Sequence, residues 1–155
     1  MKSIPRLFLL LLVLGLAGLT TLAATPQTTA PFTGTFYGRV TGDQGSSAPL
    51  VLRLTQTGDV VDGQVFVGRG LVVDGRNCGV VAVPAGVQYA TGQIQRQNPR
   101  QLTATVPLNV DGLKVNIQLT GRLSADGQTL ATQARIDLPW LCGRDPVLSG
   151  TLASQ

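Results

Sequence analysis

The sequence predicts an all-β protein: an eight-stranded antiparallel up-and-down (meander) β-barrel with one disulfide, preceded by a signal peptide. The first observation is the alternation of apolar and polar residues over 49–67, interrupted by a glycine turn at 57–59. Such period-two alternation on both sides of a turn is typical of a β-hairpin with one apolar face. The second is the lack of helical periodicity after residue 24, and the third is a single pair of cysteines. We therefore expect one barrel domain over 25–155.

The first 24 residues have the three parts of a secretory signal peptide. Lys2 and Arg6 precede an apolar run over 7–19, and small residues follow as far as Ala24. The run is shorter than the roughly 20 apolar residues that a spanning helix needs. Cleavage after Ala23 or Ala24 is therefore favoured over an uncleaved anchor. We expect an exported protein, either periplasmic or extracellular.

The expected strands follow one another along the chain. They cover 32–40, the two halves of 49–67, 87–95, 102–110, 113–123, 130–138 and 147–153. Asp111-Gly112 is a strong hairpin-turn signal between two of them, and residues 96–100 are expected to form a loop. Pro107 lies inside a strand, and because proline cannot donate a ladder hydrogen bond we expect a local break in pairing there.

Cys78 and Cys142 are expected to form a disulfide, because an even pair in an exported chain is typical of one. A metal site would need further ligands, and the chain has no His and no other Cys. The pair also decides the strand count. If 69–86 is one excursion there are eight strands, and both cysteines lie at the barrel end that bears the 41–48 loop. If 79–83 were a ninth full-length strand, the cysteines would lie at opposite ends, beyond the roughly 7 Å that a disulfide allows between Cα atoms.

The charge pattern and the aromatic residues indicate whether the protein binds nucleic acid or spans a membrane. Of the 12 Lys and Arg residues, Lys2 and Arg6 leave with the signal peptide, so ten basic residues face eight Asp. The arginines are spread singly, without the clustered basic stripe of nucleic-acid-binding proteins, so no nucleic acid is expected. An outer-membrane barrel is the competing all-β hypothesis, but the few aromatic residues are scattered rather than arranged in girdles. We expect a soluble barrel that does not span a membrane after signal cleavage.

The residue types that carry most enzyme chemistry are scarce. The chain has no His and no Glu, so the usual proton shuttle near neutral pH is missing. Most of the eight Asp residues lie in glycine-containing turns, where Asp is favoured for local hydrogen bonding. Nothing in their spacing selects the carboxylate pair that a glycosidase needs. We predict no catalytic residues, no cofactor and no metal.

The stretch Pro31-Phe-Thr-Gly-Thr-Phe-Tyr37 resembles the opening strand of the lipocalins, with Phe36 where Trp is usual. Gly34-Thr-Phe36, with the Gly45-Ser-Ser47 loop after it, is also similar to the start of avidin-type barrels. The resemblance covers about one strand and implies a calycin-type small barrel that binds a ligand or a protein. The several tryptophans that an avidin-type biotin pocket would need are absent, since Trp140 is the only one.

The candidate site lies where the two cysteines meet. Trp140 and Arg144 flank Cys142, and Arg69 and Arg76 approach Cys78. The favoured interpretation is that Trp140 plugs the barrel end while the arginines are solvated. The alternative is a ligand mouth or protein contact, because Trp and Arg are enriched in binding hot spots. The predicted function is a non-enzymatic binding module for a small apolar ligand. A protein-interaction, inhibitor or envelope-associated barrel that presents the disulfide-bonded rim is the second hypothesis.

Overall fold

The computed structural model describes residues 30–110 and 113–155, so the predicted signal peptide (1–24) and the predicted 111–112 turn lie outside the described residues. The barrel strands are β1 (Gly34–Thr41), β2 (Ser47–Thr57), β3 (Val60–Val67), β6 (Gly86–Gln95), β7 (Asn98–Val110), β8 (Leu113–Leu123), β9 (Thr129–Asp137) and β10 (Val147–Ser154). Two short strands, β4 (Val72–Asp74) and β5 (Val80–Ala82), and two 3-10 turns, η1 (Arg76–Cys78) and η2 (Trp140–Cys142), complete the chain. No described helix is long and apolar enough to cross a membrane.

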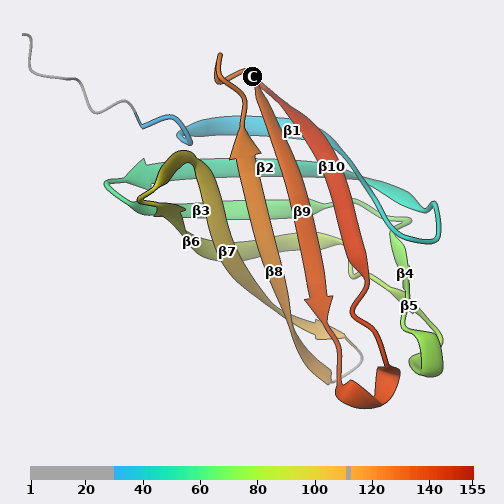
Figure 1. Cartoon of the computed structure of the whole chain (residues 1–155). Helices are drawn as coiled ribbons and strands as arrows, with labels where there is room; N and C mark the ends of the chain where they lie inside the picture. The colour runs from blue at the N-terminus through green and yellow to red at the C-terminus, as the bar shows by residue number, and fades with distance from the viewer. Residues whose placement is uncertain (1–29, 111–112) are drawn as a thin grey trace, which may run out of the picture.

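Eight strands close into an antiparallel barrel in the order β1-β10-β9-β8-β7-β6-β3-β2. The first and last strands pair along their length, with Tyr37 opposite Ala153. Figure 1 shows the two halves of the barrel: β1, β2, β3 and β6 run across the view, while β7 to β10 run steeply to them. The eight-stranded all-β barrel predicted from the sequence is therefore confirmed.

The excursion between β3 and β6 contains no full-length strand. β4 and β5 pair only with each other, with Val73 opposite Val81, and η1 forms the tip between them. Because the excursion leaves and returns at the same barrel end, Cys78 can reach Cys142. The two cysteines form a disulfide with a Cα–Cα distance of 5.0 Å, which confirms the predicted bridge.

The core follows the predicted alternation, and almost fully buried side chains lie toward both ends of the barrel. Toward the end that carries residues 30–33 they are Phe32, Phe36, Leu52, Leu130 and Leu152, and toward the other end they are Leu71, Val73 and Cys142. The barrel can coil tightly because glycine replaces larger residues where strands approach closely. A Cβ at Gly92 would lie only 2.7 Å from the carbonyl oxygen of Thr103, a separation that real side chains do not tolerate.

Two local expectations need refinement. The expected 96–100 loop is shorter, because β7 already begins at Asn98. The break expected at Pro107 occurs on one side only: Pro107 stays in register with Asn116 of β8, whereas the pairing of β7 with β6 ends at Thr91 and Thr105. Beyond that pair, Gly86–Ala90 of β6 and Val106–Val110 of β7 face each other without pairing. We call this interval the seam.

Candidate functional site

The connections 42–46, 68–85 and 138–146 share one end of the barrel, which we call the disulfide end (lower right in Figure 1). There η1 and η2 lie side by side, joined by Cys78 and Cys142. A second link parallels the disulfide, since the side-chain amide of Asn77 donates to the carbonyl oxygen of Leu141 at 3.2 Å. Two segments far apart in sequence thus form one rigid rim.

Residues 71–83, which we call the cap, are also fixed on the side away from the disulfide. The Ser46 hydroxyl donates to the carbonyl oxygen of Val72 at 2.6 Å and accepts from its N–H at 3.0 Å. The N–H of Val83 donates to the carbonyl oxygen of Leu71 at 2.9 Å, which closes the base of the hairpin. Leu71 and Val73 are buried against the barrel core. The cap is therefore a packed part of the barrel, held from two sides.

Asp145 holds the η2 segment to strand β9. Its Oδ2 accepts hydrogen bonds from Arg135 Nε at 2.8 Å, with Nη2 of the same guanidinium at 2.7 Å. Its Oδ1 accepts from the backbone N–H of Leu138 at 3.2 Å. The hydrogen bond from Arg135 lowers the pKa of the Asp145 carboxyl below its ordinary value of 3.8, with a smaller contribution in the same direction from Leu138. The loop that carries Cys142 is thus anchored by charge as well as by the disulfide.

Between the cap and the barrel lies a hollow of about 230 Å³, which we call the cap hollow. Its lining side chains are all apolar or disulfide-bonded and come from the cap, from β7, β8 and β9 and from the 138–146 loop: Val73, Cys78, Val81, Ala82, Val83, Leu108, Val115, Ile136, Leu138 and Cys142. No charged or hydroxyl-bearing side chain lines the hollow, so its side chains offer burial to apolar surface and no hydrogen bond to a polar solute.

A second, smaller cavity of about 50 Å³ lies next to the cap hollow, in the barrel interior. It shares Val83 and Leu108 with the cap hollow. Gln88 is the one residue with a polar side chain among those that line it. The barrel interior is therefore incompletely filled toward the disulfide end.

Arg76 and Arg144 are brought together, as the sequence suggested. They line a pocket of about 120 Å³ that they share with Asp43, Asp74 and Asp145. Arg76 pairs with Asp74 at 3.6 Å between Nε and Oδ2. This charged pocket is separate from the cap hollow, with which it shares no residue.

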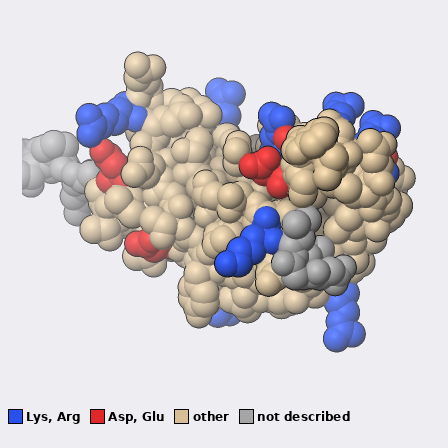
Figure 2. All heavy atoms as spheres, turned by 90° about the horizontal axis from the view of Figure 1, so that it is seen from below, with Lys and Arg blue, Asp and Glu red and all other residues tan. Residues whose placement is uncertain are grey.

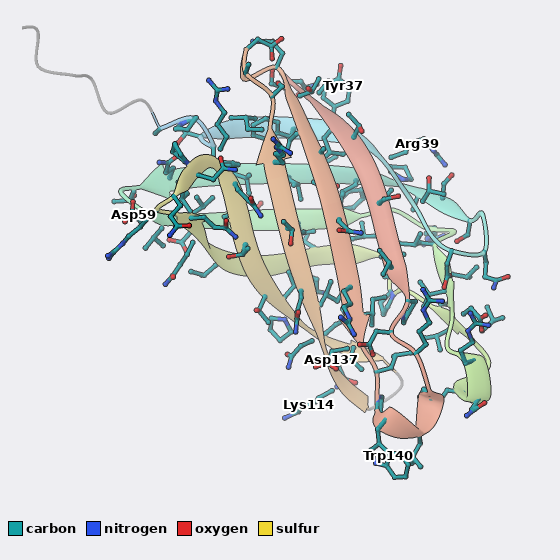
Figure 3. The ribbon with its side chains drawn as sticks, viewed as in Figure 1. Tyr37, Arg39, Asp59, Lys114, Asp137 and Trp140 are labelled. Atoms are coloured by element: carbon teal, nitrogen blue, oxygen red, sulfur yellow. A yellow bond between two sulfur atoms is a disulfide. The ribbon has the colours of Figure 1, made fainter. Side chains whose placement is uncertain are left out.

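Trp140 and Arg69 lie elsewhere. The favoured interpretation that Trp140 plugs the barrel end is wrong, because its side chain is 86% exposed and points away from the barrel (Figure 3). The reason lies in the short helix η2: Cys142 occupies its buried position, where the disulfide holds it, so Trp140 is left on the outer side. Arg69 is exposed just after β3 and lines neither the charged pocket nor the cap hollow.

The residues that sequence reasoning missed are those of the cap. Val81 and Val83 lie in the glycine-rich excursion, where no periodicity marks an inward face. The short apolar run at 80–83 was the available signal, since such a run amid turn residues needs a surface to pack against.

Polar chemistry is sparse around these hollows. Within the part of the chain that the structure describes, no group of three or more His, Cys, Asp or Glu side chains is placed to hold a metal ion. Seen from below in Figure 2, basic and acidic side chains are scattered over a largely uncharged surface. The arrangement can bury an apolar molecule; it does not assemble an acid–base pair at the cap hollow.

Comparison with known proteins relates the chain to designed barrels. No protein-family model matches it, and no curated protein matches it. Among solved structures, EF1p2_mFAP2b bound to DFHBI has a TM-score of 0.54 at 14% identity, covering 81% of this chain and 94% of that one. The redesigned β-barrel mFAP1, also bound to DFHBI, has a TM-score of 0.53 at 12% identity and covers 79% of this chain and 94% of that one. A de novo fluorescence-activating β-barrel has a TM-score of 0.50 at 11% identity and covers 80% of this chain and 94% of that one.

At such low identity the likeness shows the fold alone. This chain shares the small, closed, eight-stranded antiparallel barrel of these structures. What such a barrel does depends on the site built on it, and the cap hollow is the candidate here.

Proposed function

We propose that this protein is a non-enzymatic binding module that takes a small apolar ligand into the cap hollow. The observation that carries the proposal is the composition of that hollow, about 230 Å³ in volume with an apolar wall. Burying about 200 Å² of ligand surface there contributes about 5 kcal/mol at about 25 cal/mol per Å². That energy alone corresponds to a Kd of about 0.2 mM, and the cost of association weakens it, so such a ligand binds with millimolar or weaker affinity.

The volume narrows the ligand class. An apolar cavity of about 150 Å³ can bind benzene, whereas sites for drug-sized ligands start near 300 Å³. The cap hollow lies between these sizes. A single substituted ring or a short branched hydrocarbon fits it, and a long lipid chain does not. The structural neighbours bound to DFHBI support this at the level of the fold, since they bind a small molecule on the same kind of barrel.

The cellular location of the protein and its lack of a reaction are also part of the proposal. We place the mature protein outside the cytoplasm, after removal of residues 1–24, because the N-terminus has the pattern of a signal peptide and a disulfide persists in oxidising compartments. We assign it no reaction of its own, because the chain has no His and no Glu and its hollow is walled by apolar side chains.

The test is an NMR titration of the barrel with p-xylene, with glucose as a polar comparison of similar size. We expect saturable shifts of the methyl groups of Val83, Leu108 and Val115 with p-xylene and none with glucose. These three residues line the cap hollow on different elements. Absence of saturable shifts at all three positions would contradict the proposal.

A second candidate function, contact with a protein partner through the rim, is favoured by a separate observation. Trp140, Leu141 and Val80 are large apolar side chains that remain well exposed next to the disulfide. Exposed aromatic anchors on rigidly held loops are typical of interaction sites. The test is a pull-down from the exported fraction of the producing cell. A genuine rim partner is lost with Trp140→Ala and Arg144→Ala and kept when the 124–128 turn at the opposite end is altered.

A further inference from the structure

We propose that the seam between β6 and β7 accepts an extended peptide, which adds to the barrel as a strand along β6. This inference goes beyond ligand binding in the cap hollow and does not depend on it. It rests on a stretch of the β6 edge that β7 leaves unpaired, and on Pro107, which prevents β7 from pairing there.

The register shows how long the open edge is. β6 pairs with β3 without interruption from Val60 opposite Gln93 to Val67 opposite Gly86. On its other side β6 pairs with β7 only as far as Thr91 opposite Thr105. Five residues, Gly86–Ala90, therefore have a neighbouring strand on one side only, a length of about 17 Å at about 3.4 Å per residue.

The direction of the backbone groups follows from one hydrogen bond. The N–H of Ile94 donates to the carbonyl oxygen of Asp59 at 2.8 Å, so Ile94 faces β3. Because backbone groups alternate sides along a strand and the β3–β6 register is unbroken, Gln88 and Ala90 also face β3. Val87 and Tyr89 therefore direct their N–H and C=O groups into the seam, which leaves four backbone groups free for an added strand.

Pro107 explains why β7 does not close the seam. Continuing the register from Thr91 and Thr105 would place Tyr89 opposite Pro107 and Val87 opposite Asn109. Pro107 would stand at a position whose N–H points toward β6, and it has none. β7 nevertheless remains paired with β8 on its other side, with Asn109 opposite Lys114. The barrel is thus held rigid on both sides of an open interval.

The side chains around the seam suit an extended chain with apolar residues. On the outer face, Tyr89 is 71% exposed and Val87 is 50% exposed, and Val87 stands opposite Phe66 of β3, which is also exposed. On the inner face, Gln88, Val106 and Leu108 line the interior cavity. An added strand would contact apolar surface with both of its alternating faces.

The occupant is a single peptide rather than a second copy of the barrel. β7 bounds the seam on the side opposite β6, so a strand that already belongs to another sheet would bring its own neighbours into collision with β7. A lone chain brings no neighbouring strands with it. Arg69 and Lys114 stand at the Val87 end of the seam, and neither forms an ion pair within the described residues. An acidic residue at that end of the peptide complements them.

Hydrogen exchange of the free protein tests the open edge. We expect the amides of Val87 and Tyr89 to exchange much faster than those of Gln88 and Ala90, which point to β3. Equal protection of all four amides would overturn the proposal, because it would mean that the edge is already paired.

Peptide binding tests the occupant, with acetyl-Glu-Val-Thr-Val-Thr-Val-amide as the probe and its form N-methylated at alternate residues as the comparison. We expect the unmethylated peptide to bind and to slow exchange at Val87 and Tyr89. Val87→Pro removes one seam-facing N–H without touching the β3 ladder, and it should weaken binding about fivefold or more. Replacing Glu by Lys in the peptide should also weaken binding.

Pro107→Val provides the complementary variant, because it restores an N–H that lets β7 pair with Tyr89 and close the seam. Binding should fall at least about tenfold, whereas Pro99→Val, a matched change at the opposite end of β7, should leave it unchanged. Equal binding to wild type and Pro107→Val would overturn the inference. So would concentration-dependent dimerisation abolished by Val87→Pro, since it would make a second copy the occupant.

Discussion

Ser46 holds both backbone groups of Val72, since its hydroxyl donates to the carbonyl oxygen at 2.6 Å and accepts from the N–H at 3.0 Å. This one side chain from the β1–β2 loop satisfies two backbone groups of β4 that a neighbouring strand would otherwise pair with. It therefore fixes the cap on the side away from the disulfide, and with it one wall of the cap hollow.

Ser46→Ala should loosen the cap while leaving the barrel closed. Two hydrogen bonds are lost and two partly buried backbone groups lose their partner, so we expect a loss of about 1–3 kcal/mol in the free energy of unfolding. Urea denaturation measures the loss, and faster hydrogen exchange at Val72 locates it. Ser149→Ala, on the exposed face of β10, is the matched control and should change little. An unchanged Val72 exchange rate would contradict this role for Ser46.

The disulfide should contribute more to the free energy of unfolding than any single hydrogen bond of the rim. The bridge spans a sequence separation of 64 residues. In the chain-entropy model a loop of that size corresponds to about 4 kcal/mol of stability. Replacing both Cys78 and Cys142 by Ser should lower stability by about 2–4 kcal/mol, and thiol titration of the unreduced, denatured wild type should find no free thiol. Two reactive thiols would refute the bridge.

Acid should weaken the attachment of the η2 loop to β9. The pKa of Asp145 is lowered in the folded protein, chiefly by its hydrogen bond from Arg135. A carboxyl with a lowered folded-state pKa stabilises the fold fully above the unfolded value, near pH 4, and this contribution is lost as pH falls through the folded pKa.

Asp145→Asn should therefore be less stable than wild type at pH 7, by no more than about 1 kcal/mol because Arg135 is largely exposed. The difference should shrink as the pH falls below about 4. Stability curves that stay parallel down to pH 2 would show that this carboxyl has no part in the acid response.

Gly92 should not tolerate a side chain, because a Cβ there would meet the carbonyl oxygen of Thr103 at 2.7 Å and the Leu102 side chain at 2.8 Å. Gly92→Ala should cost about 1–3 kcal/mol in the free energy of unfolding, as overpacking in a close-packed interior does. Gly45→Ala changes a loop glycine whose added Cβ would meet nothing within 4 Å, although the positive φ of 70° adds some strain. Thermal unfolding of the two variants should rank Gly92→Ala as the less stable, and the reverse order would contradict the packing argument.

The barrel could be predicted because alternation is a local signal that each strand carries by itself. Leu50, Leu52 and Leu54 are inward and buried as the pattern required. The strand count needed one long-range constraint, the pairing of Cys78 with Cys142, which ruled out a ninth full-length strand. The break at Pro107 was also foreseeable, since the missing N–H is a property of the residue. Its restriction to the β6 side depends on the register, which the sequence leaves open.

The site was less predictable. Alternation predicts which side chains point inward, but not whether they leave a cavity between them. Leu108, Val115 and Ile136 belong to the predicted inward set, yet only the position of the cap leaves a hollow against them. Trp140 was misplaced because its exposure depends on which residue of η2 the disulfide turns inward, and composition favours burial for a lone Trp.

The most direct test of the central claim is to fill the cap hollow and measure binding of p-xylene. Val81 lines the hollow from the cap, so Val81→Trp should occupy much of its volume. Val60→Trp makes the same change on the surface of β3 at the opposite end of the barrel. With both variants shown to be folded, binding should be lost in Val81→Trp and kept in Val60→Trp. Undiminished binding to Val81→Trp would show that the ligand site is not the cap hollow.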